Sequence, residues 1–225
     1  MTTVAEARLR ATEKPNKYVY VVVYHNAARA LPSDESRRDS TILEIVSETT
    51  PARPESELQL TLGLALLKGE KFDLAVQKST ELGVQAIVPV VTKLADIRLK
   101  DAADARRRVD RWQRIALEAA KQSGRARVPD IFSPATLSDL LQARRSETGL
   151  MFSERQGQSI DAVLANASSP VTVLVGSEGG WTDSEIDEAR ETGWQVVTLG
   201  GRTMRAETAA IAVTALIQHR LGDLK

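Results

Sequence analysis

Apolar and polar positions follow two different rhythms along most of the chain. From Leu58 onward, short apolar runs typical of buried strands occur at Leu58–Leu66, Ala86–Val91, Leu150–Phe152, Val171–Val175 and Trp194–Leu199. Between them, apolar residues recur every three or four positions, which predicts helices at Lys71–Leu82, Ala103–Ser123, Asp183–Glu191 and Glu207–Leu221. Alternating strands and helices are typical of an α/β fold, in which a parallel sheet carries helices on both faces.

The residues at the helix ends support this interpretation. Gly83, Gly124 and Gly193 follow three of the predicted helices, where a glycine commonly ends a helix. Thr182 and Glu185 stand three residues apart at the start of the Asp183–Glu191 helix and predict a capping box there.

The first part of the chain has a different pattern. Lys17–Tyr24 and Thr41–Val46 are rich in β-branched or aromatic residues and predict two strands, joined by an exposed loop over Asn26–Ser40. Thr49–Glu57 contains two prolines and predicts a linker. We therefore expect a small β-rich module at residues 1–56 and an α/β domain at residues 57–225.

Composition narrows the possible functions. The 225 residues are 42% hydrophobic and 27% charged, which is ordinary for a soluble globular protein. No apolar stretch is long enough to cross a membrane, and the N-terminus lacks a signal layout, so a cytoplasmic protein is expected. With no cysteine and two histidines, zinc-ribbon, iron–sulfur and thiol-nucleophile chemistry is excluded and no metal is expected; His25 and His219 are interpreted as structural or exposed.

Two glycine loops carry the strongest chemical signal. Gly176-Ser177-Glu178-Gly179-Gly180 follows the strand Val171–Val175, and Gly200-Gly201-Arg202-Thr203-Met204-Arg205 follows the strand Trp194–Leu199. Ligands of α/β sheets bind beyond the carboxyl ends of the strands, and glycines allow a close approach to the backbone. The spacing matches neither a dinucleotide fingerprint nor a triphosphate loop, and no acidic residue that would hold a ribose ends the second strand. The loops predict one ligand pocket, against the alternative of tight turns alone.

Basic residues are concentrated locally although 30 basic and 30 acidic residues balance over the chain. Between Arg98 and Arg127 there are ten basic and four acidic residues. This stripe could neutralise phosphates, and a solvated helix face is the alternative. At its end, Gln122-Ser123-Gly124-Arg125-Ala126-Arg127 offers amide, hydroxyl and guanidinium groups suited to RNA phosphates and base edges.

Arg205 and Glu207 follow the second glycine loop at the junction with the last helix. Both side chains can turn toward the pocket there; alternatively, Glu207 favours the helix dipole while Arg205 lies on the surface.

Four blocks together resemble the bacterial ribosomal RNA small subunit methyltransferase E family. They are KGEKFDLAVQKSTELGVQAIVPV (68–90), RWQRIALEAAKQSGRARVPDI (111–131), LVGSEGGWTDSEI (174–186) and LGGRTMRAETAAI (199–211). The resemblance implies an enzyme that methylates a uracil N3 in 16S ribosomal RNA with S-adenosyl-L-methionine. It also implies a SPOUT-type α/β domain with a C-terminal trefoil knot, a PUA-like N-terminal module, and a homodimer.

The resemblance also assigns roles to individual residues. The cofactor pocket would comprise Leu174, Gly176, Gly179, Gly180, Leu199, Gly200, Thr203 and Met204. Arg205 and Glu207 match the R-x-E of the family and would lie beside the transferred methyl group. From the chemistry of the reaction, we expect Glu207 to act as base and Arg205 to stabilise negative charge on the uracil oxygens. Lys78 matches the Q-K-x-x-E-L-G helix of the family, and Gln122 and Arg125 match its Q-S-G-R. Together with Arg127 of the basic stripe, these residues are expected to bind RNA.

The chain departs from the family pattern at several positions. Ser177 replaces the proline of the usual G-P-E-G-G, Thr92-Lys93-Leu94 replaces an S-E-R segment, and the N-terminal H-x-x-x-V-L-R stretch is missing. Two rival functions remain open: a SPOUT methyltransferase acting on another RNA such as transfer RNA, and an RNA-binding module that has lost catalysis. The last helix, apolar nearly all round, independently predicts a partner subunit.

Overall fold

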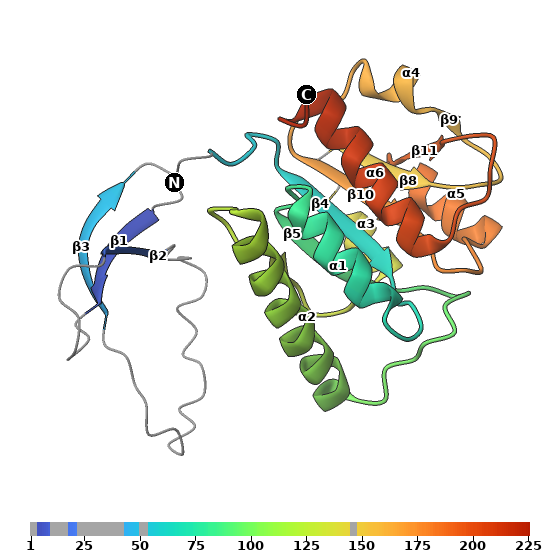
Figure 1. Ribbon diagram of the computed structural model, residues 1–225. Coiled ribbons are helices and arrows are strands. Elements are labelled where there is room, and N and C mark those ends of the chain that lie inside the picture. Colours follow the sequence, from blue (N-terminus) through green and yellow to red (C-terminus); the bar gives the residue numbers. More distant parts are fainter. Residues whose placement is uncertain (1–3, 10–17, 22–42, 50–53, 145–147) are drawn as a thin grey trace. The chain divides into compact units, whose positions relative to one another are not determined.

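The chain forms two compact units, Met1–Glu55 with Gly124–Val128 and Ser56–Ser123 with Pro129–Lys225. The computed structural model, drawn in Figure 1, describes residues 4–9, 18–21, 43–49, 54–144 and 148–225. His25 and the loop predicted over Asn26–Ser40 lie outside the described residues.

The first unit contains a small antiparallel sheet. Its strands are β1 (Val4–Leu9), β2 (Tyr18–Val21) and β3 (Leu43–Thr49), in the order β2-β1-β3. Two of them, β2 and β3, lie where the sequence predicts strands. β1 was not predicted, because its apolar residues alternate with charged and small ones over only six positions.

The second unit is built on an eight-stranded sheet in which every pairing is parallel. The order is β6-β5-β4-β10-β8-β11-β9, with β7 also paired to β5. The strands are β4 (Leu60–Ala65), β5 (Ala86–Val91), β6 (Asp130–Ile131), β7 (Ala135–Thr136), β8 (Thr148–Phe152), β9 (Gln158–Ser159), β10 (Val171–Val175) and β11 (Gln195–Thr198). The α/β class and the five strands predicted for this part of the sequence are confirmed.

Helices cover both faces of this sheet (Figure 1). They are α1 (Lys71–Glu81), α2 (Ala102–Ser123), α3 (Leu137–Ala143), α4 (Ile160–Leu164), α5 (Asp183–Glu191) and α6 (Ala206–Leu221). On one face α1 packs against α2 and α6, and on the other α3 packs against α5. Gly63 of β4 faces α3, since a Cβ there would touch Leu140, so its neighbours Leu62 and Leu64 face the α1 side.

The helix ends follow the predicted local chemistry. Thr182 Oγ1 accepts the Glu185 N–H while the Glu185 carboxylate accepts the Thr182 N–H, so the predicted capping box of α5 is confirmed. α3 and α4 were not predicted from the sequence; each begins with a hydroxyl cap, at Thr136 and Ser159.

A column of buried polar contacts joins α6 to α1. The hydroxyls of Ser79 and Thr214 lie 3.4 Å apart, and Gln218 Nε2 donates to the Gly83 carbonyl at 3.0 Å. Gln218 Oε1 accepts from Ser56 Oγ at 3.1 Å. Because the Gln218 side chain is fully buried, these bonds fix the last helix in one register against α1 and against the chain that enters β4.

Candidate cofactor pocket

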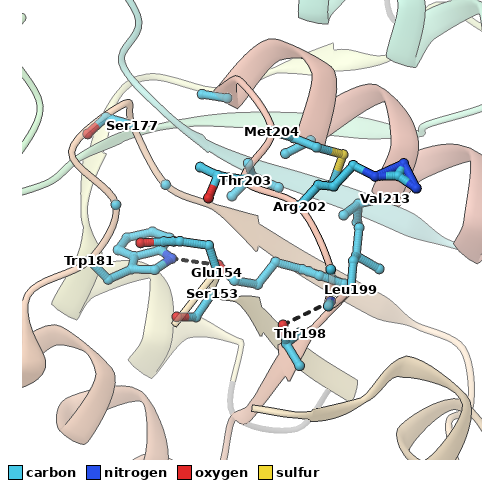
Figure 2. A pocket seen from close by; sticks show the side chains of 18 residues that line it. Ser153, Glu154, Ser177, Trp181, Thr198, Leu199, Arg202, Thr203, Met204 and Val213 are labelled. Carbon is cyan, nitrogen blue, oxygen red and sulfur yellow. Dashed lines mark hydrogen bonds between the residues drawn. The ribbon is translucent and has the colours of Figure 1, made fainter. Parts of the chain in front are cut away.

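Three neighbouring strands end at one cavity of the second unit. β10, β8 and β11 are adjacent and parallel, so their carboxyl ends meet at one edge of the sheet. The segments that follow them surround a cavity of about 290 Å³ (Figure 2). This is the position at which α/β sheets bind their ligands.

The first glycine loop, residues 176–180, packs tightly against its surroundings. A Cβ on Gly176 would lie 3.2 Å from the Trp181 ring, and one on Gly179 would lie 2.9 Å from Leu94 Cβ. Gly180 has a φ of +69° and sits beneath the Glu154 carboxylate. Glycine is therefore required in this loop by close packing as well as by backbone conformation.

An ion pair connects the first glycine loop to α1. Lys71 Nζ of α1 donates to Glu178 Oε1 at 2.6 Å. Burial by itself raises the pKa of the Glu178 carboxyl, but the hydrogen bond and charge of Lys71, with the Glu178 backbone N–H, outweigh it and hold this pKa below its usual value. A second pair, Lys68 with Asp96, lowers the pKa of Asp96 through the lysine's hydrogen bond and charge.

The second glycine loop, residues 200–205, is open. Gly200 and Gly201 have φ values of +68° and +71°, and a Cβ on either would meet nothing within 4 Å. The bonds that shape this loop are local: the Gly200 N–H donates to Thr198 Oγ1 at 3.1 Å, and the Arg202 N–H donates to the Gly200 carbonyl at 2.8 Å. Both glycines are thus required by the left-handed backbone.

Six of the eight predicted cofactor residues line this cavity: Gly176, Gly180, Leu199, Gly200, Thr203 and Met204. Leu174 does not, because its side chain is fully buried in the core between the sheet and α3. Gly179 also lies outside the lining, against Leu94.

Sequence reasoning missed the third wall of the cavity. Phe152 ends β8, Ser153 and Glu154 follow it, and all three line the cavity. Trp181 lines it as well and donates from Nε1 to the Phe152 carbonyl at 2.8 Å (Figure 2). The sequence could have indicated these residues, because Leu150–Phe152 is a predicted strand and ligands of α/β sheets bind beyond the carboxyl ends of the strands. Ser177 and Arg202 also line the cavity.

Arg205 and Glu207 flank Ala206, which lines the cavity. Arg205 is the exposed N-cap residue of α6 and makes no side-chain cap bond. Glu207 is 8% exposed, and its Oε2 has no hydrogen-bond partner among the described residues. A buried carboxylate oxygen without a partner is unusual, and a catalytic role is one of the reasons for which proteins keep such a group.

The residues predicted to bind RNA lie in two places. Lys78 and Gln122 line a groove between α1 and α2, which also contains Arg111 and Arg114. Lys78 is paired there with Glu81 at 2.9 Å.

Arg125 and Arg127 belong to the first unit, in the loop after α2. The Arg125 side chain is 7% exposed and its guanidinium is paired with Glu55 at 2.6 Å, so a phosphate contact at Arg125 does not fit the structure. The N–H groups of Ala126 and Arg127 donate to the same carboxylate at 2.8 and 3.0 Å. The Arg127 residue is partly buried. Short sequence patterns do not reveal such a partner 70 residues away.

The described residues contain no helix that is both long and apolar enough to cross a membrane. Nor do they bring together three or more His, Cys, Asp or Glu side chains that could hold a metal ion.

Comparison with known proteins connects this pocket to one group. The profile of the RNA methyltransferase domain matches residues 54–218. The ribosomal RNA small subunit methyltransferase E of Mesomycoplasma hyopneumoniae is 34% identical over 196 residues, covering 85% of this chain and 82% of that protein. The protein of the same name from Synechocystis is 34% identical over 198 residues, covering 86% of this chain and 62% of that protein.

A solved structure extends the likeness to three dimensions. The chain superposes with a TM-score of 0.75 on ribosomal RNA small subunit methyltransferase E from Neisseria gonorrhoeae bound to S-adenosyl methionine, at 36% identity, covering 82% of this chain and 75% of that one. The resemblance carried by the four sequence blocks is thereby confirmed. This chain belongs to the RNA methyltransferase domain family and, within it, to the ribosomal RNA small subunit methyltransferase E group.

Proposed function

We propose that this chain is an S-adenosyl-L-methionine-dependent methyltransferase that methylates N3 of a uridine in 16S ribosomal RNA. The observation that carries the proposal is the three-walled cavity at the carboxyl ends of β8, β10 and β11, in a chain 36% identical to a relative bound to S-adenosyl methionine.

The residues of the cavity fit this cofactor. Four glycines of the two loops line it and, having no side chains, let a ligand approach the backbone closely, while Leu199, Met204 and Val213 supply apolar surface. Its volume of about 290 Å³ is near the lower end of the range usual for small-ligand sites. Gly176, Gly180, Leu199, Gly200, Thr203 and Met204 would hold the cofactor, with Leu174 and Gly179 supporting the first loop from behind.

The cofactor supplies an electrophilic methyl group on a sulfonium sulfur. The chain must place uracil N3 in line with that methyl group and remove the N3 proton. In this proposal Glu207 accepts the proton at Oε2, the oxygen without a partner among the described residues. Arg205, exposed at the start of the same helix, stabilises negative charge on the uracil oxygens.

RNA binding is proposed for Lys78 and Gln122 in the groove between α1 and α2, and for Arg127. The basic side chains of Arg111 and Arg114 in this groove support it. Arg125 contributes indirectly in this proposal, by holding Glu55 and the loop that carries Arg127.

The finer architecture is also part of the proposal. It comprises a SPOUT-type domain at 57–225 with a C-terminal trefoil knot, a PUA-like module at 1–56, and a cytoplasmic homodimer. The antiparallel sheet of the first unit supports the module. On α6, the partly exposed apolar side chains Ile211, Ala212, Ala215 and Leu216 support a partner subunit.

The test is methylation of ribosomal RNA from a strain that lacks this protein. With added protein and S-adenosylmethionine, we expect a new reverse-transcription stop at one uridine of 16S RNA, because an N3 methyl group blocks base pairing. Methylation of transfer RNA alone would favour the first rival. RNA binding without cofactor binding or methylation would favour the inactive module.

A further inference from the structure

Glu154 presents a carboxylate to the cofactor cavity whose hydrogen-bonding capacity is unused. Its Oε1 lies 2.9 Å from where a Cβ of Gly180 would stand, so the carboxylate covers the first glycine loop (Figure 2). Among the described residues it accepts no hydrogen bond, and its one ion pair is with Arg155 Nε at 3.9 Å. A charged acceptor at a cavity wall is therefore available to a ligand.

The backbone on both sides of Glu154 is fixed. The Ser153 N–H donates to the Val197 carbonyl of β11 at 2.9 Å, and the Arg155 N–H donates to Ser153 Oγ at 3.3 Å. The Arg155 guanidinium reaches the Trp181 carbonyl and pairs with Asp183 at 3.2 Å. The loop thus holds the Glu154 Cα in place before a ligand arrives, which favours a binding role over that of an unconstrained surface carboxylate.

The position of this carboxylate indicates which part of a nucleoside it binds. In dinucleotide-binding α/β folds, an acidic side chain at the end of a strand neighbouring the glycine loop accepts the ribose hydroxyls. β11, the strand that follows the first glycine loop in the chain, ends at Thr198 without an acid. β8 lies between β10 and β11 in the sheet and places Glu154 at the same edge.

We propose that the Glu154 carboxylate binds the ribose hydroxyls of the adenosyl cofactor. The inference rests on the proposed function, in that the cavity receives S-adenosylmethionine. The competing assignment is an ion pair between Glu154 and the cofactor's α-ammonium group. The two assignments differ for 5′-methylthioadenosine, which keeps the ribose but has no ammonium group.

The experiment is calorimetric titration of the full chain with S-adenosylmethionine, S-adenosylhomocysteine and methylthioadenosine. Loss of a hydrogen bond to a charged group predicts that Glu154→Ala weakens all three ligands by a similar factor of about 10 to 100. Glu154→Gln, which keeps one acceptor oxygen, should lie between the parent and Glu154→Ala. Glu191→Ala is the matched control, because it removes an exposed carboxylate at the far end of α5 and should leave all three affinities unchanged.

A 2′-deoxy analogue of methylthioadenosine sharpens the assignment. The parent should bind it more weakly than methylthioadenosine, while Glu154→Ala should bind the two nearly equally. For each protein, the affinities of the two ligands are compared with one another, so the result does not depend on the fraction of that protein that is folded. Unchanged affinities in Glu154→Ala, or a loss confined to the two ligands with an ammonium group, would overturn the inference. If the parent chain binds none of the ligands, the proposed function itself fails.

Discussion

The two glycine loops stand side by side at the cofactor cavity but use glycine for different reasons. In the loop at residues 176–180, added Cβ atoms would strike Trp181, Leu94 or Glu154. In the loop at residues 200–205, Gly200 and Gly201 have open space above them and a left-handed backbone. The first loop is therefore part of the packed protein, whereas the space over the second is left for a ligand. Substitutions should separate stability from cofactor binding accordingly.

Gly176→Val should have the largest effect. The new side chain would overlap the Trp181 ring and the Gly180 backbone, both within 3.3 Å of its Cβ, and overpacking of this kind costs about 1–3 kcal/mol. We expect a lower melting temperature by calorimetry together with loss of S-adenosylmethionine binding. Gly176→Ala should show a smaller loss of both. A Gly176→Val protein as stable as the parent would contradict the packed character of this loop.

Gly200→Ala should have an intermediate effect, on cofactor binding as well as on stability. A Cβ at a φ of +68° costs about 1–2 kcal/mol, and relaxation of the loop should weaken S-adenosylmethionine by about tenfold. Gly193→Ala is the matched control, because Gly193 has a φ of +87° and open space but follows α5 away from the cavity. We expect Gly193→Ala to lose about as much stability as Gly200→Ala but to bind S-adenosylmethionine as tightly as the parent. If the two variants bind S-adenosylmethionine equally well, the second loop is not part of the site.

Glu178→Gln should have the smallest effect, and one that depends on pH. Because the folded-state pKa of Glu178 is lowered, its pairing with Lys71 stabilises the protein at neutral pH, and this contribution disappears as the pH falls through that pKa. For a pair so exposed we expect about 0.2–1 kcal/mol at pH 7, measured by urea unfolding. The difference from the parent should shrink as the pH falls and vanish once the pH lies below the lowered pKa of Glu178. Glu118→Gln, which removes the exposed pair with Lys121 on α2, is the comparison variant.

The sequence was most informative where local chemistry decides the structure. β5, β10 and α5 begin and end where predicted, because runs of apolar residues and a capping box mark their ends. α3 was missed because it has only seven residues, although Leu137, Leu140 and Leu141 follow the helical period.

The site was less predictable where a residue's role depends on the direction in which its side chain points. All five residues of β10 are buried, so alternation could not show that Leu174 points into the core. Glu154 follows a short strand without a glycine signature, and its role depends on strand order in space. The burial of Arg125 depends on Glu55, which lies 70 residues away.

The Gln218 side chain has a consequence for synthesis of the protein. It joins the last helix to Ser56, 162 residues earlier in the chain, and to Gly83, 135 residues earlier. β4, in the interior of the sheet, likewise cannot complete its pairing until β10 has been synthesised. At a translation rate of about 5–20 residues per second, the ribosome needs roughly 8–30 s to extend the chain from Ser56 to Gln218. In the first part of that interval, until β10 has been made, β4 lacks one of its two neighbours, and the contacts of the last helix with Ser56 and Gly83 can form only after Gln218 has left the ribosome.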